Sequence, residues 1–164
     1  MRKAETKNLA GYCGFYCGVC EIYRAYRDSQ ELREIIAEKH GCSPDEVRCA
    51  GCRAVEEIGW KYDKEWSLNC KIRECAIEKG VEFCIDCEDF GKCKKFKKFA
   101  EICKGLGIDL IRNMKEIKEK GIEKWLTEQD KKYRCKYCGK PIIVSYEFKK
   151  CHWCGKEIKR TINN

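Results

Sequence analysis

Apolar side chains recur at helical spacing along most of this chain, and glycine, serine and proline mark where that spacing stops. After a loop of cysteines and glycines at residues 12–20, an imperfect apolar stripe predicts a helix of about twenty residues that ends at Lys39-His40-Gly41. The next segment, Ser43-Pro44-Asp45-Glu46, has the form of a capping box with proline at the first helical position. It predicts a short helical start before Cys49.

The second half of the chain predicts further helices and then a change of pattern. Helical spacing is found at residues 68–79, 92–104, 109–117 and 121–132. In the second of these, Phe96 and Phe99 fall on the same side as Cys103, so we expect a buried face beneath a lysine-covered surface. From Tyr133 onward, β-branched and aromatic residues such as those at 141–148 are typical of short strands.

Together these patterns predict an α+β chain made of three parts. Residues 1–107 form an α-rich, irregular, metal-stabilised cysteine-rich domain, residues 108–132 a helical connector, and residues 133–164 a small β zinc ribbon. No internal repeat is evident in the sequence. No apolar stretch reaches the roughly 18 residues of a membrane span, so we expect no membrane partner.

Cysteine is the most unusual component, because the 164 residues contain 16 cysteines and only 2 histidines. Residues 1–7 are charged and polar, unlike a secretory signal, which favours a cytoplasmic location where thiols stay reduced. In that compartment a dense cysteine pattern indicates metal binding rather than disulfides. High lysine, glutamate and isoleucine content with little glutamine also favours a thermophilic source.

The formal net charge of +8 is concentrated at the C-terminus. Residues 131–164 carry ten basic and two acidic side chains, whereas the basic and acidic groups of the first 130 residues cancel. A metal ion held by four thiolates adds negative charge, so metal binding makes the first part acidic and leaves the tail basic. We therefore expect attraction to a polyanion to reside in the tail.

Two copies of the motif C-x-x-C-G-K near the C-terminus predict a structural zinc site. The glycine after each second cysteine allows a turn in which backbone N–H groups point at the sulfurs. Four cysteines leave no open position for catalysis, and we interpret His152, between two of them, as a surface residue. The four predicted ligands are Cys135, Cys138, Cys151 and Cys154.

A longer series of cysteines occupies residues 10–96. It runs Cys13-Gly14-x-x-Cys17-x-x-Cys20, Cys49-x-Gly51-Cys52, Cys70-x-x-x-x-Cys75-Ala76, Lys79-Gly80-Val81-Glu82-Phe83-Cys84-x-x-Cys87 and Cys93. This order resembles the small, cysteine-rich prokaryotic family catalogued as domain of unknown function 3795. The resemblance implies a metal-binding fold but no established reaction.

Ten cysteines suffice for two four-ligand sites, so with the C-terminal site we expect about three zinc ions. Cys42 and Cys103 lie outside the pattern, and Cys103 is expected to be buried. One natural division joins Cys17/Cys20 with Cys49/Cys52, and Cys70/Cys75 with Cys84/Cys87, while Cys13 and Cys93 can replace a member of either set.

The alternative cofactor is a [4Fe–4S] cluster at the N-terminal cysteines Cys13, Cys17 and Cys20. Their spacing is that of radical S-adenosylmethionine enzymes, but the chain is too short for the partial barrel that those enzymes need. A plain cluster for electron transfer or redox sensing remains the alternative to zinc.

No P-loop, nucleophile elbow or dinucleotide-binding motif is present, which favours a non-catalytic protein over an enzyme. The basic tail combines lysines with aromatic residues, which neutralise phosphates and stack on unpaired bases. We expect a zinc-binding module that contacts RNA, DNA or a ribonucleoprotein. An iron–sulfur redox or metal-sensing protein and an adaptor that docks a protein partner are the alternatives. The expected nucleic-acid contacts are Lys136, Lys140, Lys149, Lys150, Trp153, Lys156, Lys159 and Arg160.

Overall fold

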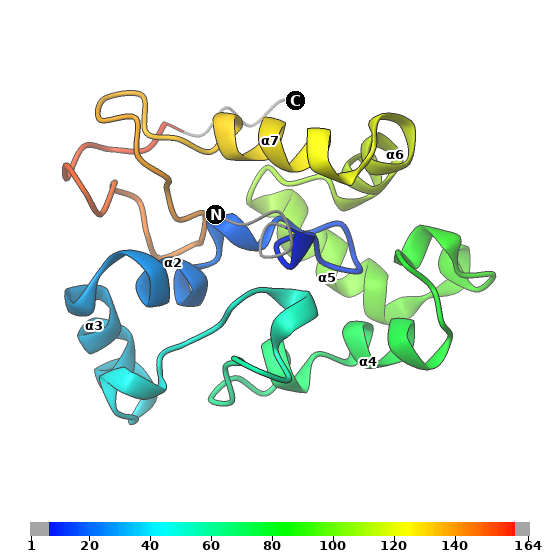
Figure 1. The fold of residues 1–164 in the computed structure, drawn as a ribbon, viewed down its shortest axis with the longest axis horizontal. Coiled ribbons are helices and arrows are strands. Elements are labelled where there is room, and N and C mark those ends of the chain that lie inside the picture. The colour runs from blue at the N-terminus through cyan, green and yellow to red at the C-terminus, as the bar shows by residue number, and fades with distance from the viewer. Residues whose placement is uncertain (1–6, 160–164) are drawn as a thin grey trace.

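The computed structural model describes residues 7–159, which fold into six α-helices joined by 3-10 turns and irregular loops. The helices are α2 (Glu21–Asp28), α3 (Gln30–His40), α4 (Lys71–Glu78), α5 (Lys94–Gly105), α6 (Leu110–Lys120) and α7 (Ile122–Lys132). The N-terminal cysteine loop lies centrally, with α6 and α7 along one edge of the molecule and α2 and α3 at another (Figure 1). None of these helices combines the length and apolar character needed to span a membrane.

The single helix predicted after the cysteine loop is wrong, because Ser29 divides it. Ser29 has an extended backbone (φ −158°, ψ 123°), and its Oγ accepts a hydrogen bond from the backbone N–H of Leu32 at 3.2 Å. Ser29 therefore ends α2 and caps α3. The end of α3 is confirmed, since Gly41 adopts the left-handed conformation (φ 65°).

The other predicted helices are confirmed, with boundaries that differ by a few residues. The carboxylate of Asp109 caps α6 by accepting a hydrogen bond from the N–H of Arg112 at 3.0 Å, and α7 follows Gly121 directly. Helix α4 is shorter than predicted because Cys70 precedes its first turn. The capping box at Ser43 is present but starts only a single 3-10 turn.

Two hydrophobic clusters hold the helices together. The larger cluster surrounds Trp125 of α7 and includes Phe96 and Cys103 from α5. Burial of these two α5 residues confirms the apolar face predicted for that helix. The smaller cluster packs Ile36 of α3 against Trp60 in the loop that precedes α4.

The segment 142–144 lies between the two clusters instead of forming a ribbon strand. Ile142 and Val144 belong to the larger cluster and Ile143 to the smaller one. Successive side chains of an extended chain point to opposite sides, so this segment contributes to both clusters. The N–H of Val144 donates to the carbonyl oxygen of Val19 at 3.0 Å rather than to a neighbouring strand. Across residues 7–159 there are three isolated β-bridges and no strand ladder. The fold is therefore helix-rich, and the expected β ribbon and α+β class are not observed.

A tight contact holds the N-terminal cysteine loop against α6. Gly14 has a φ of 84°, and a Cβ at this position would lie 2.7 Å from both the Leu110 carbonyl oxygen and Met114 Cγ. The carbonyl oxygen of Gly14 accepts a hydrogen bond from the buried side chain of Asn113 at 2.9 Å. Glycine is therefore required here, and the contact fixes the loop at residues 12–20.

Candidate metal centres

The two C-terminal knuckles have the same backbone geometry. In the first, the N–H of Cys135 donates to the Lys140 carbonyl oxygen and the N–H of Gly139 donates to the Cys135 carbonyl oxygen, both at 2.8 Å. The second knuckle repeats both hydrogen bonds at 2.8 Å within residues 151–156. Its glycine has a φ of 71°, against 72° for Gly139, so both turns use the left-handed conformation that glycine permits.

The four sulfurs of the knuckles lie at distances that suit one zinc ion. The Sγ atoms of Cys135 and Cys154 are 3.7 Å apart, as are those of Cys138 and Cys151, and all four lie within 4.8 Å of one another. A zinc ion with four sulfurs at about 2.3 Å defines a tetrahedron with edges of about 3.8 Å. This donor set fits zinc and completes its coordination.

Backbone N–H groups point at the sulfurs, as the motif predicts. Those of Cys138 and Tyr137 lower the pKa of the Cys135 thiol to about 7, which favours the thiolate that a metal ion needs. Burial raises the pKa of Cys151 to about 12, although the N–H groups of Cys154 and Trp153 act in the opposite direction. Metal binding therefore requires a proton to leave Cys151.

The side chain of Trp153 joins the two knuckles. Its Nε1–H donates to the Pro141 carbonyl oxygen at 3.0 Å, and Lys140 Nζ lies 4.3 Å from the centroid of the Trp153 ring. The indole remains 38% exposed. Trp153 therefore supports the metal site and also contributes aromatic surface.

The interpretation of His152 as a surface residue is wrong. Its side chain is 5% exposed, and Nε2 lies 3.0 Å from Oδ2 of Asp28 on α2. Asp28 also lies 3.6 Å from Nε of Arg24, another buried side chain. These contacts attach the second knuckle to α2. Sequence spacing carried no signal of the contact, because the two partners are 124 residues apart.

Three N-terminal cysteines occupy the same place in a repeated structural unit: a 3-10 turn, a cysteine and an α-helix. Cys20, Cys70 and Cys93 each donate a backbone N–H to the carbonyl oxygen three residues earlier, at 3.0, 3.2 and 3.3 Å. They are the N-cap residues of α2, α4 and α5, where helix N–H groups favour a thiolate. No sequence repeat accompanies this unit, because only the cysteine is shared.

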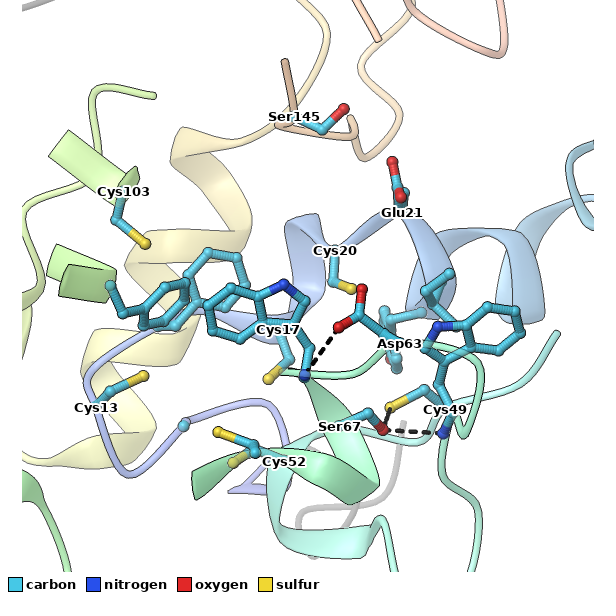
Figure 2. Close-up of a pocket in the computed structure, with 18 of the residues that line it drawn as sticks. Cys13, Cys17, Cys20, Glu21, Cys49, Cys52, Asp63, Ser67, Cys103 and Ser145 are labelled. Atoms are coloured by element: carbon cyan, nitrogen blue, oxygen red, sulfur yellow. Dashed lines mark hydrogen bonds between the residues drawn. The ribbon is translucent and has the colours of Figure 1, made fainter. Parts of the chain in front are cut away.

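A cavity of about 280 Å³ opens among the N-terminal cysteine loop, the knuckle at 49–52 and α5. Figure 2 shows the side chains of Cys17, Cys20 and Cys52 directed toward its interior. Apolar and aromatic side chains form most of the remaining wall, and no described lining residue is lysine or arginine. Its cysteines are Cys13, Cys17, Cys20, Cys49, Cys52, Cys70 and Cys103.

Four of these thiols influence one another electrostatically. Burial raises the pKa of Cys17, and the neighbouring Cys52, Cys49 and Cys20 raise it further. Burial also raises the pKa of Cys20 to about 12 and that of Cys52 to about 11. The structure thus places the first predicted set of four cysteines around one cavity. These thiols would have to lose their protons to bind a metal ion.

The second set surrounds a smaller cavity of about 50 Å³. Cys70 lines the larger cavity instead, so Cys93 takes its place. Lys79 Nζ lies 3.6 Å from Cys87 Sγ, a basic neighbour that the cysteine spacing did not indicate. The cysteines of this set are Cys75, Cys84, Cys87 and Cys93. Cys42 lines neither cavity.

The basic residues predicted to contact nucleic acid lie on the surface of the knuckles. A groove of about 190 Å³ runs between the end of α7, the first knuckle and residues 157–159. Lys132 and Arg134 also line this groove and were not among the predicted contacts, and Tyr137, one of the aromatic residues of the basic tail, lines it too. Arg160 lies outside the described residues. The exposed lysines are Lys136, Lys140, Lys149, Lys150, Lys156 and Lys159.

Comparison with known protein families gives a match over the first part of the chain. The family described as "Protein of unknown function (DUF3795)" matches residues 9–98, more than half of the 164 residues. No curated protein and no solved structure matches the chain. The matched region contains every cysteine that lines the two cavities except Cys103. It ends before the C-terminal knuckles.

Proposed function

This chain belongs to the DUF3795 family, and we propose that it is a zinc-stabilised module that binds single-stranded nucleic acid, free or in a ribonucleoprotein. The binding surface is that of residues 133–159, called here the C-terminal module. Its zinc ion would be structural, because four cysteine ligands leave no coordination position for water or substrate. Binding is therefore favoured over catalysis at this site.

The observation that carries the proposal is the concentration of unpaired positive charge on the C-terminal module. Some lysines on the helices pair with carboxylates, as in Lys98 with Glu65 at 3.0 Å. Within residues 7–159 the exposed lysines of the C-terminal module have no ion pair, and the nearby Glu147 is occupied by Lys39 of α3. Unpaired positive charge on a rigid support favours contact with phosphates.

The groove beside these lysines supports contact with an unpaired strand rather than a duplex. Lys136 and Lys159 lie on its walls, and Tyr137, which is 63% exposed, lies at its edge. A tyrosine in this position can stack on an unpaired base while the lysines neutralise the adjacent phosphates. A groove of about 190 Å³ has room for one nucleotide unit but not for a double helix.

The test is the binding of fluorescently labelled single-stranded RNA and DNA to the zinc-loaded protein, measured by anisotropy over a series of salt concentrations. Contact with about four phosphates gives a slope of about −3 for the logarithm of the binding constant against the logarithm of the salt concentration. The double variant Lys136→Glu/Lys159→Glu should weaken binding by about tenfold or more.

The matched control is Lys97→Glu/Lys115→Glu, which makes the same charge change at exposed lysines of α5 and α6. The control should leave binding nearly unchanged. Equal weakening by the two double variants would mean that net charge, not this groove, drives binding. No binding of either oligonucleotide at about 50 mM salt would reject the proposal and leave protein docking as the role of the surface.

A further inference from the structure

We infer that the 280 Å³ cavity holds a [4Fe–4S] cluster ligated by Cys17, Cys20, Cys49 and Cys52, a site independent of the proposed nucleic-acid surface. The first reason is a contrast within one chain. The four sulfurs of the C-terminal module lie within 4.8 Å of one another, and no other group of three ligand atoms in residues 7–159 does so. Zinc needs sulfurs at the corners of one small tetrahedron, whereas the thiolates of a cluster bind different iron atoms and lie further apart.

The second reason is the volume of the cavity that these four cysteines line. All four are labelled among its lining residues in Figure 2. A cavity needs only about 10–15 Å³ to hold a water molecule, and a lone metal ion bonded to four sulfurs needs no cavity of this kind. About 280 Å³ accommodates a group of several atoms.

The chemistry of the wall selects a cationic, sulfur-binding group. Glu21 and Asp63 are the lining carboxylates, and the described lining residues include no lysine or arginine that would attract an anion. Phe99 packs on Trp66 with ring centres 4.5 Å apart and covers part of the cavity. Thiolate ligands in an apolar pocket are typical of iron–sulfur sites.

Backbone N–H groups approach three of the four sulfurs. The N–H of Cys52 points at the sulfur of Cys17, that of Tyr12 at Cys52, and those of Tyr23 and Ile22 at Cys20. Hydrogen bonds to the sulfurs, together with burial, are the features by which a protein sets the reduction potential of a cluster. The cavity already has both features.

The proposed ligands are the first four-cysteine set predicted from the sequence, and they replace Cys13 of the predicted cluster with the pair at 49 and 52. Cys13 lines the same cavity, and the cysteines that influence it electrostatically include Cys52 and Cys84. Cys17/Cys20 and Cys49/Cys52 are two C-x-x-C pairs that line this one cavity, so we assign the cluster to them.

The experiment is anaerobic expression and purification of the full chain with iron and sulfide supplied, followed by metal and sulfide analysis. The expected result is about four iron and four sulfide per chain at this site, one zinc, broad absorption near about 400 nm and an iron–iron path in X-ray absorption. Zinc in place of iron under these conditions would overturn the inference.

Single substitutions locate the cluster. Cys17→Ser and Cys49→Ser should each lose the iron and the visible absorption while keeping the zinc, and Cys138→Ser should lose the zinc while keeping the iron. Cys103→Ser, which changes a thiol in the same cavity wall, should change neither. Iron that survives Cys17→Ser and Cys49→Ser but not Cys84→Ser would place the cluster at the smaller cavity and contradict the inference. If a variant fails to fold, the X-ray absorption of the unaltered protein decides between zinc and a cluster.

Discussion

The imidazole of His152 in the second C-terminal knuckle lies 3.0 Å from the carboxylate of Asp28 on α2, and both side chains are at least nine-tenths buried. Because an ionised carboxylate only accepts hydrogen bonds, Nε2 of His152 is the donor. Nε of Arg24 lies 3.6 Å from the same carboxylate oxygen, Oδ2. One buried aspartate thus joins the C-terminal module to the cysteine-rich region.

Replacement of this aspartate should be costly. Asp28→Ala leaves two buried polar side chains, His152 and Arg24, without their common partner. We expect a loss of at least about 2 kcal/mol in the free energy of unfolding, because buried polar groups lose their water on folding and gain nothing in exchange. Denaturant unfolding of the zinc-loaded protein measures this value.

Glu147→Ala is the matched control for that prediction. Glu147 pairs with Lys39 on α3 and so joins the same two regions, but both side chains of this ion pair are largely exposed. Its loss should cost no more than about 1 kcal/mol. Equal effects of Asp28→Ala and Glu147→Ala would show that burial of the His152 contact does not matter for stability.

A second prediction separates steric contact from backbone strain at two glycines. Gly14 and Gly80 both have positive φ values, 84° and 64°, but a Cβ at Gly14 would meet Leu110 and Met114 at 2.7 Å, whereas a Cβ at Gly80 meets nothing within 4 Å. Gly80→Ala should cost about 1–2 kcal/mol of strain. Gly14→Ala should cost clearly more and also shift α6, which thermal unfolding and amide chemical shifts report. Similar losses of stability in the two variants would mean that the loop at residues 12–20 moves away from α6 at little cost.

A third prediction concerns the reactivity of the thiols. In the metal-loaded protein, alkylation followed by mass spectrometry should label Cys42 and none of the proposed ligands of the cluster and the zinc ion. The pKa of the Cys103 thiol is raised to about 12 by burial and the residue is 1% exposed, so it should not react. Labels on Cys17, Cys20, Cys49 or Cys52 would show that those thiols are not metal-bound.

The rate of labelling at Cys42 should increase with pH. Partial burial and then the nearby Glu46 raise the pKa of this thiol, so the reactive thiolate is the minor form at neutral pH. Glu46→Gln removes the negative charge, lowers the pKa and should speed labelling at a fixed pH. A slower reaction in this variant would contradict the assigned electrostatic effect.

A fourth prediction is that loss of the C-terminal zinc loosens the centre of the molecule as well as its end. The segment 142–144 follows the first knuckle and enters both hydrophobic clusters. In Cys138→Ser, hydrogen exchange at Val144, whose N–H is bonded to Val19, should rise by about tenfold or more. Cys42→Ser is the control and should leave it unchanged. A rise confined to residues 151–159 would count against this coupling.

Features that depend on a few neighbouring residues could be predicted from the sequence. The cap at Asp109, the end of α3 at Gly41 and the knuckle turns each depend on side chains and φ values within one short segment. The fixed spacing of two C-x-x-C-G-K motifs likewise predicted which four sulfurs meet. Local chemistry was sufficient in these cases.

Features that depend on distant partners could not be predicted. The burial of His152 requires Asp28 on another element. The β-branched residues 142–144 are extended as predicted from their side chains, but they pack into the two hydrophobic clusters instead of pairing in a ribbon. The break at Ser29 had a local signal, a possible N-cap three residues before Leu32, which the apolar stripe outweighed.

The repeated turn–cysteine–helix unit has a consequence for how the chain folds. Helices α2 and α4 have eight residues each, fewer than the roughly 12–15 at which an isolated helix becomes stable in water. The costly step for such helices is nucleation, the fixing of the first turn. In each of them a cysteine, Cys20 or Cys70, stands directly before that turn. A metal centre that captures such a cysteine, as proposed for Cys20, fixes the starting point of its helix, so helix growth proceeds outward from the centre toward the C-terminal end of the segment.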